Sequence, residues 1–177
     1  QGIPCKGSAY GTSHCAVVGN DAFWNVEGGI GFADDAAGSV LHNVAACNVR
    51  SGIQTSELTG DAEIAIFNNI VWANVAAGIL DGGSLKGYNL YSANLAWPVS
   101  CDDTPQGQQC MRPQYGYNQG GTLGEESLFV DPEFLDAVGF DYTCSAGSPA
   151  IDSGTDVSQY YSWPTQGAGP DRGSDER

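Results

Sequence analysis

The chain contains 177 residues, a length typical of one domain and sufficient to bury a hydrophobic core. Its formal net charge is −15 with only six Lys and Arg residues, which argues against nucleic acid and anionic membranes as partners, and against tight binding of polyanions without a bridging cation. No apolar stretch approaches the length of about 18 residues that a membrane-spanning helix needs.

The N-terminal residues 1–15 are rich in Gly and Ser, and we expect them to form a loop or cap over the structure that follows. Gln1 is compatible with a mature terminus left by removal of a signal peptide. An acidic, Lys-poor chain of this kind with an even number of cysteines is typical of an oxidising compartment, so we expect a secreted or cell-surface protein.

The six cysteines include two pairs that are close in sequence. Cys5 and Cys15 form one such pair and Cys101 and Cys110 the other, and we predict a disulfide within each. No Cys-x-x-Cys motif is present, which argues against a zinc site. Cys47 occupies a column of small residues in the repeat described next, and the sequence leaves open whether Cys144 reaches it.

Residues 16–97 contain a repeat in which two Asn residues are separated by four others. The four copies are Asn20–Asn25, Asn43–Asn48, Asn69–Asn74 and Asn89–Asn94. After the second Asn, the first three copies continue with Val, two further residues and Gly-Ile, at Val26–Ile30, Val49–Ile53 and Val75–Ile79. The copies begin 23, 26 and 20 residues apart, and a repeat of about this length is typical of solenoids and propellers.

Short β-branched segments within such a repeat predict a parallel β-helix, in which each copy forms one coil and equivalent residues form columns. We expect Asn to adopt the left-handed conformation that bends one strand into the next and to hydrogen-bond to the Asn above and below. The stacked residues would be Asn43, Asn69 and Asn89 in one column, and Asn25, Asn48, Asn74 and Asn94 in the other. Gly is expected at a second bend and Ile in the core. The alternative is a β-sandwich in which Asn-rich loops recur by chance.

Residues 98–126 interrupt the period and are interpreted as a long excursion, after which residues 127–177 form the final coils and a C-terminal cap. The segments of this tail that carry a resemblance are FVDPEF from Phe129, FDYTC from Phe140, GSPAIDSGTD from Gly147 and QGAGPDRGSDE from Gln166. Together with the coil NNIVWAN from Asn68, they resemble the choice-of-anchor Q domain family of secreted bacterial β-helix proteins. The resemblance covers roughly residues 16–176 and implies a right-handed parallel β-helix. It implies no particular activity, and Arg172 stands where that family usually has Ile.

Carboxylates at equal offsets in the repeat are the candidates for catalysis or metal binding. Asp34 and Glu57 each follow a Gly-Ile pair by four residues, and Asp81 follows the third pair by two. We expect stacking to bring Asp34, Asp35, Glu57 and Asp81 to one face, where they would form a Ca²⁺ site, a catalytic pair or a solvated acidic edge.

The candidate bases are His42, Arg50 and Lys86. Neither His42 nor His14 has a Ser or Cys partner at a suggestive spacing, so a catalytic triad is not supported. Arg50 lies at a variable position between Asn48 and Gly52, where a lone Arg is also explained as a surface charge.

Aromatic residues are numerous for a small chain, and exposed rings on a β-helix can stack on sugars. They are Trp24, Trp72, Tyr88, Tyr91, Trp97, Tyr115, Tyr117, Tyr160, Tyr161 and Trp163. The alternative is that these rings pack the core and cover the excursion.

We therefore expect residues 1–177 to form one β-helix domain that acts as a secreted or cell-surface, non-catalytic structural or interaction module, with Ca²⁺ as the one candidate cofactor. The alternatives are a polysaccharide lyase, a glycoside hydrolase or a glycan-binding module. Because residues 1–15 are a thin cover for the first coil, we also expect self-association through that coil into oligomers or filaments. The alternative is a monomer whose Cys5–Cys15 loop covers the end.

Overall fold

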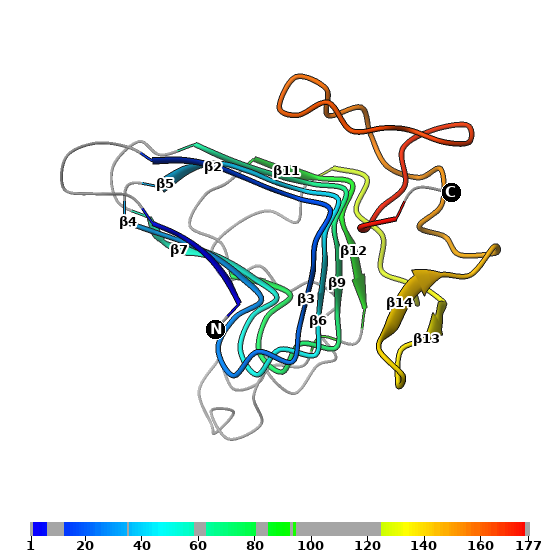
Figure 1. Cartoon of the computed structure of the whole chain (residues 1–177), viewed down its shortest axis with the longest axis horizontal. Coiled ribbons are helices and arrows are strands. Elements are labelled where there is room, and N and C mark those ends of the chain that lie inside the picture. Colours follow the sequence, from blue (N-terminus) through cyan, green and yellow to red (C-terminus); the bar gives the residue numbers. More distant parts are fainter. Residues whose placement is uncertain are drawn as a thin grey trace.

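The structure, a computed structural model, describes residues 2–6, 13–34, 36–58, 63–80, 85–92, 94 and 125–175. These residues form a right-handed parallel β-helix, which confirms the predicted fold class. In Figure 1 the coils run clockwise as they recede from the N-terminal end, and parallel crossovers of this hand are the rule in proteins. The described residues contain no helix, and therefore no helix long and apolar enough to cross a membrane.

Three parallel sheets form the walls of the β-helix. The first sheet contains β1 (Ile3–Lys6), β4 (Ile30–Asp34), β7 (Ile53–Leu58) and β10 (Ile79–Leu80). The second contains β2 (Ser13–Val18), β5 (Ala36–Leu41), β8 (Ile64–Phe67) and β11 (Leu85–Gly87). The third contains β3 (Asp21–Phe23), β6 (Val44–Ala46), β9 (Ile70–Trp72) and β12 (Leu90–Ser92). Strands β2 to β10 make three complete coils, and partial coils precede and follow them.

The start of the chain is part of the solenoid rather than only a cap. Ile3 in β1 pairs with Ile30 in β4, so Gly2-Ile3 extends the Gly-Ile column by one coil. Strand β2 begins at Ser13 and pairs with β5. The described residues within 1–15 therefore belong to the first and second sheets, which corrects the expectation of a loop over the first coil.

The interior is filled by the Ile column and by the other inward-facing side chains of the three sheets. Ile30, Ile53 and Ile79 stack in register and are completely buried. Successive residues of a strand point to opposite faces, so Ile30 and Phe32 face the core while Gly31 between them faces outward. This alternation explains why the Ile column marks the core and also which residues shape the outer surface of the first sheet.

The bends on both sides of the third sheet are made by the residue before each Asn, and not by the Asn itself as expected. Before Asn20, Asn43, Asn69 and Asn89, the residues with positive φ are Gly19, His42, Asn68 and Tyr88. Before Asn25, Asn48 and Asn74 they are Trp24, Cys47 and Ala73. A single left-handed residue reverses the chain direction locally, which leaves the following Asn side chain free to point along the column.

Both Asn columns are hydrogen-bonded ladders. The Oδ1 atom of Asn74, for example, accepts bonds from the backbone N–H of Asn48 at 3.0 Å and from its Nδ2 at 2.8 Å. The Nδ2 of Asn74 donates to the Ala45 carbonyl at 2.8 Å and to Asn94 Oδ1 at 2.8 Å. The same pattern recurs in the column of Asn20, Asn43, Asn69 and Asn89. The ladders thereby satisfy backbone groups that the two buried bends would otherwise leave without partners.

The regular occurrence of Gly before Ile in the repeat has a steric cause. A Cβ atom on Gly52 would lie 2.5 Å from Val71 Cγ1 and 2.7 Å from Asn74 Nδ2. Gly52 is not among the residues with a left-handed φ. The Gly column therefore makes room for the Asn ladder, rather than providing the bend that the sequence suggested.

The C-terminal strap, defined here as residues 131–175, leaves the solenoid instead of forming further coils. Residues 125–128 add only two isolated bridges to the last coil. The strap then forms an antiparallel hairpin of β13 (Phe134–Asp136) and β14 (Asp141–Cys144), followed by turns without a helix or strand. The strap is rich in Gly, Pro and Asp, which favour turns over ladder pairing.

The strap lies beside the third sheet and contacts every coil, so it covers a side of the β-helix more than its C-terminal end (Figure 1). Tyr142, Cys144 and Ala150 of the strap form a second apolar cluster with outward-facing residues of the third sheet. Those residues are Val44, Ala46, Ile70 and Leu90. Burial on both faces explains why the strands of this sheet are apolar at consecutive positions.

The strap is attached along the column of left-handed residues that precede the Asn ladder. Trp163 stacks on the His42 ring at a centroid distance of 5.2 Å. Thr155 exchanges two hydrogen bonds with the Asn68 side chain, at 2.7 and 2.9 Å. Arg172 lies over the Tyr88 ring and bonds to the last coil. The side chains of this column, which point outward at each bend, therefore serve as the docking points of the strap.

We expect the strap to loosen in acid because His42 must stay neutral. Its side chain is 1 % exposed, and burial lowers its pKa from 6.5 to about 4. Its Nε2 lies 3.2 Å from Asn68 Nδ2, a donor, so Nε2 accepts and carries no proton. In the unfolded chain His42 binds a proton as the pH falls below about 6.5, whereas in the folded chain it stays neutral down to about pH 4. The contribution of neutral His42 to the stability of the folded chain is therefore complete above pH 6.5 and is lost as the pH falls through 4. The loss is at most about 3 kcal/mol.

Urea unfolding of the wild type and of His42→Asn across this pH range measures the effect. Asn is suited to the position because Asn68 occupies the next place in the same column with positive φ. The carboxylates titrate in both proteins, so the difference between the two pH profiles isolates His42. Parallel profiles would contradict the prediction.

One predicted disulfide is present, between Cys5 in β1 and Cys15 in β2, with the two Cα atoms 6.3 Å apart. Cys101 and Cys110 lie outside the described residues. Cys47 and Cys144 are not joined by a disulfide, although both lie in the apolar cluster beneath the strap, where Tyr142 donates a hydrogen bond to Cys47 Sγ at 3.9 Å. Burial raises the pKa of the Cys47 thiol, which keeps it in the unreactive neutral form.

Candidate functional site

Two of the four carboxylates predicted as a Ca²⁺ or catalytic site, Asp34 and Glu57, lie in described strands. The register between β4 and β7 shifts by one residue, so that Glu57 pairs with Ala33, and Asp34 with Leu58. The backbones of Asp34 and Glu57 are therefore displaced by one position from the alignment that their equal offsets suggested, and the site itself stays a prediction. Asp35 and Asp81 lie outside the described residues. Within the described part of the chain, no three His, Cys, Asp or Glu side chains are grouped so as to hold a metal ion.

The three candidate bases and His14 occupy separate places. His42 is buried beneath the strap, as described above, and Lys86 is buried in β11. His14 is exposed on β2. Arg50 is exposed in the turn before β7, where it lines the pocket described next. The structure therefore does not bring these four residues together.

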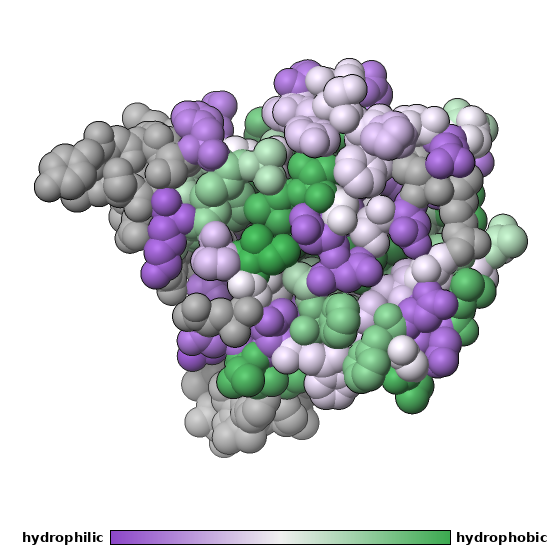
Figure 2. Space-filling model, in the orientation of Figure 1, coloured by the Kyte–Doolittle hydropathy of each residue, from purple (hydrophilic) through white to green (hydrophobic). Residues whose placement is uncertain are grey.

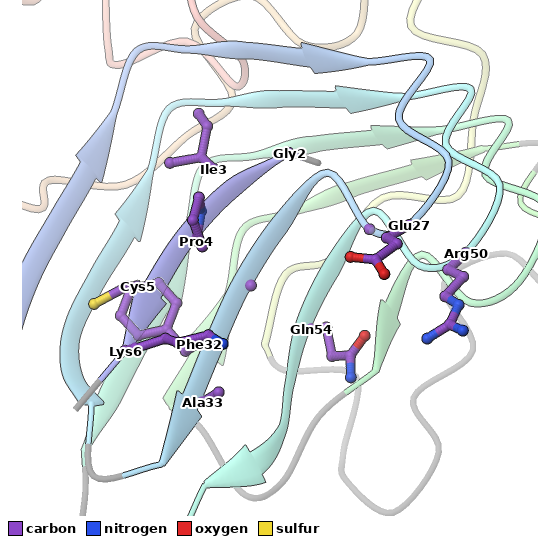
Figure 3. A pocket seen from close by; sticks show the side chains of 12 residues that line it. Gly2, Ile3, Pro4, Cys5, Lys6, Glu27, Phe32, Ala33, Arg50 and Gln54 are labelled. Atoms are coloured by element: carbon purple, nitrogen blue, oxygen red, sulfur yellow. The ribbon is translucent and has the colours of Figure 1, made fainter. Parts of the chain in front are cut away.

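A pocket of about 320 Å³ lies on the outer face of the first sheet, at its N-terminal edge (Figure 3). Its lining comes from β1, from β4 and β7, and from the two turns that precede β4 and β7. Pro4 pairs with Gly31, and Gly31 with Gln54, so these three side-chain positions form one outward-facing column. Lys6 pairs with Ala33 in the next outward column.

The pocket exists because the middle coil of these columns carries almost no side chain. A Cβ atom added to Gly31 would meet nothing within 4 Å, and Ala33 contributes only a methyl group. The larger side chains of Pro4, Lys6 and Gln54 on the neighbouring coils form its walls. The hollow is thus a property of stacking small residues between large ones, and its volume is at the lower end of the range for ligand pockets.

The polar ends of Glu27, Arg50 and Gln54 lie on one side of this pocket in Figure 3. Glu27 and Arg50 are equivalent residues in successive turns, joined by a backbone bond from Arg50 N–H to the Glu27 carbonyl at 3.0 Å. Lys6 and Arg50 are both exposed, and neither forms an ion pair with a described residue. Two of the six Lys and Arg residues of a chain with 21 carboxylates therefore line one small hollow.

These groups define what the pocket can bind. The Arg50 guanidinium has the planar fork that matches a carboxylate, and Lys6 supplies a second positive charge. The Glu27 carboxylate accepts hydrogen bonds from hydroxyl groups, and the amide of Gln54 both donates and accepts. Pro4 offers apolar surface. The arrangement suits a small ligand with one carboxylate and several hydroxyl groups, and it contains one carboxylate among the lining residues rather than the pair that a glycosidase uses.

The aromatic residues divide into covering and exposed groups. Trp72 lies under the hairpin of the strap, Tyr91 is buried, and Trp163 stacks on His42. Trp24, Tyr160 and Tyr161 are exposed. Tyr88 is partly buried beneath Arg172. Trp97, Tyr115 and Tyr117 lie outside the described residues. Most described rings therefore pack against other parts of the chain, as the alternative interpretation held, and Trp24 is the most exposed of these rings at 63 %.

The first coil forms the N-terminal end of both Asn ladders. The Oδ1 atoms of Asn20 and Asn25 accept no hydrogen bond from another described residue, whereas each later Asn accepts two. The inward-facing Val17 and Ala22 of this coil are nevertheless buried. Self-association through this coil into oligomers or filaments stays a prediction.

Comparison of the chain with protein-family models, with curated proteins and with solved structures found no match. The class of protein is therefore defined by its architecture. The chain is a short parallel β-helix of three complete coils with a lateral C-terminal strap and a small pocket of mixed charge on its first sheet.

Proposed function

We propose that the chain is a secreted or cell-surface interaction module without catalytic activity, and that its pocket binds a glycan residue carrying a carboxylate. The observation that carries this proposal is the position of Lys6 and Arg50, without ion-pair partners among the described residues, around the hollow at Gly31. A single acidic sugar can be held by the two cations of the pocket. A long polyanion would also be repelled by the net charge of −15 on the rest of the chain.

Two further observations support the secreted location and the interaction role. The Cys5–Cys15 disulfide is typical of an oxidising compartment. The repeats and the tail resemble the choice-of-anchor Q domain family, a resemblance that rests on the motifs quoted above. The residues that form the walls of the pocket lie mainly on the strands of the solenoid, so the shape of the pocket is fixed before a ligand binds.

Calorimetric titration with glucuronate and with glucose tests the proposal. We expect glucuronate to bind and glucose to bind at least about tenfold more weakly, because a hydrogen-bonded charge pair contributes about 1.5–3 kcal/mol. Arg50→Ala should lose a similar factor. Arg50→Lys should recover only part of it, because Lys keeps the charge but lacks the fork.

Gly31→Val provides a steric control that leaves every charge in place. The added side chain would fill the hollow without meeting other atoms at its Cβ, so folding should be unchanged while glucuronate binding is lost. Equal binding of the two sugars, or unchanged affinity in Gly31→Val, would refute the proposed site. Formation of an unsaturated uronate from an oligosaccharide would instead establish the lyase alternative.

A further inference from the structure

An exposed aromatic group is formed by two segments that are far apart in sequence. Trp24, at the end of β3, is 63 % exposed, and Phe140, in the turn between β13 and β14, is 54 % exposed. Phe23 lies beside them, and Val138 of the same turn is 91 % exposed. We call Phe23, Trp24, Val138 and Phe140 the aromatic patch. Figure 2 shows hydrophobic surface at the lower right, where Figure 1 places this hairpin against the third sheet.

The rings of the patch are held in a fixed arrangement. Phe140 stacks on Phe23 at 5.8 Å and meets Trp24 edge-on at 6.2 Å. Phe23 also packs on Tyr142 at 5.2 Å. Trp24 is therefore held against the ring of Phe140 while much of its surface stays in water. A rigid, exposed group of this kind loses little conformational entropy on binding.

The bend at Trp24 does not require an aromatic residue. Cys47 and Ala73 occupy the places equivalent to Trp24 in the next two coils, with the same left-handed φ. Exposed apolar groups that do not serve the fold are characteristic of interaction surfaces.

The charges around the patch are acidic. Asp21, at the start of β3, is close enough to Asp141 and Asp175 for their charges to raise its pKa. The charge of Asp21 in turn raises the pKa of Tyr142. Of the described Lys and Arg residues, Lys6 and Arg50 line the pocket, while Lys86 and Arg172 are buried in or beside the last coil. The patch is therefore an apolar platform in a negative field.

We propose that the aromatic patch is the docking surface for a basic segment of a partner protein. The aromatic faces attract Lys and Arg side chains through cation–π contact, and the surrounding carboxylates and the net charge of −15 favour a positive partner. A second copy of this chain would bring like charges together, and an acidic polymer would be repelled. A neutral glycan could stack on the aromatic rings, but the negative electrostatic potential would not increase its affinity.

The test uses a short peptide in which Lys alternates with Leu, and the same peptide with Glu in place of Lys. We expect the basic peptide to bind, to weaken as salt is raised, and to bind Trp24→Ala about three- to tenfold more weakly. Trp24→Ala should fold, because Ala73 occupies the equivalent position. Trp24→Phe keeps a ring and should retain most of the affinity.

Tyr161→Ala is the matched control, since it removes another exposed ring without changing the charge. Unchanged affinity in Tyr161→Ala together with the loss in Trp24→Ala would support the proposal. Three results would overturn it: equal affinities of Trp24→Ala, Tyr161→Ala and the wild type, tight binding of the acidic peptide, or a dimer in light scattering that Trp24→Ala dissociates. Displacement of the basic peptide from Trp24 by a neutral oligosaccharide of higher affinity would also count against it.

Discussion

Replacement of Asn74 by Leu is expected to lower the free energy of unfolding by about 3–5 kcal/mol. The Asn74 side chain makes four hydrogen bonds, and the residue is 0 % exposed. Leu would leave the Asn48 N–H without a partner inside the solenoid, and the Ala45 carbonyl would keep only its bond within the sheet. A buried group left without a partner costs about 1–3 kcal/mol, and each further hydrogen bond that is lost costs about 1 kcal/mol. The branched Leu would also press on Gly52, whose position beside Asn74 has no spare space.

Equilibrium unfolding in urea measures this loss, and Asn25→Leu is the matched control. Asn25 stands at the open N-terminal end of the same ladder, is only partly buried, and accepts no bond from another described residue. Its replacement should cost about 1 kcal/mol, so the two variants should differ clearly. Equal losses would show that position within the ladder does not matter and would contradict the hydrogen-bonding account.

The repeat allowed the solenoid to be predicted because its determinants are local and periodic. Asn at two fixed positions and Gly-Ile at a third recur in nearly every coil. Asn forms the ladder, Gly leaves the space beside it, and Ile fills the core. Gly2-Ile3 was missed because no Asn pair precedes it. The signal was nevertheless present, since Ile3 precedes Ile30 by 27 residues, close to the spacing of the other copies.

The pocket and the strap could not be predicted in the same way because they depend on register and on contacts between distant segments. The offset of Arg50 in the repeat was evident, but Arg50 and Lys6 line the same pocket only because β1 stacks on β4. The hollow exists because Gly31 has no side chain and Ala33 has only a methyl group, and no sequence motif marks this pair of small residues. The one-residue shift between β4 and β7, which separates Asp34 from Glu57, is likewise visible only when the strands are paired.

Arg172 lies between the strap and the last coil, and its side-chain hydrogen bonds give it a structural role. The guanidinium donates to the Asn89 carbonyl at 2.9 Å, to the Glu126 carbonyl at 2.9 Å and to the Ser153 carbonyl at 2.7 Å. It is almost completely buried, and burial lowers its pKa to about 10, so it remains charged at neutral pH. Arg172 thus joins the strap to the last coil.

Arg172→Ile, which removes the guanidinium but keeps an apolar side chain, is therefore expected to destabilise this chain by about 2–4 kcal/mol. Ile fills part of the space but leaves the Glu126 and Ser153 carbonyls, which the guanidinium had satisfied, without a donor, while the Asn89 carbonyl keeps its bond from the Leu128 N–H. Urea unfolding measures the loss, and hydrogen exchange should show the largest increase in the strap around Ser153. Arg50→Ile is the control, because Arg50 is exposed and its replacement should change stability by less than about 0.5 kcal/mol. If the two variants were equally stable, Arg172 would not be the anchor of the strap, and the attachment would have to rest on Trp163, Thr155 and the apolar cluster of Tyr142 alone.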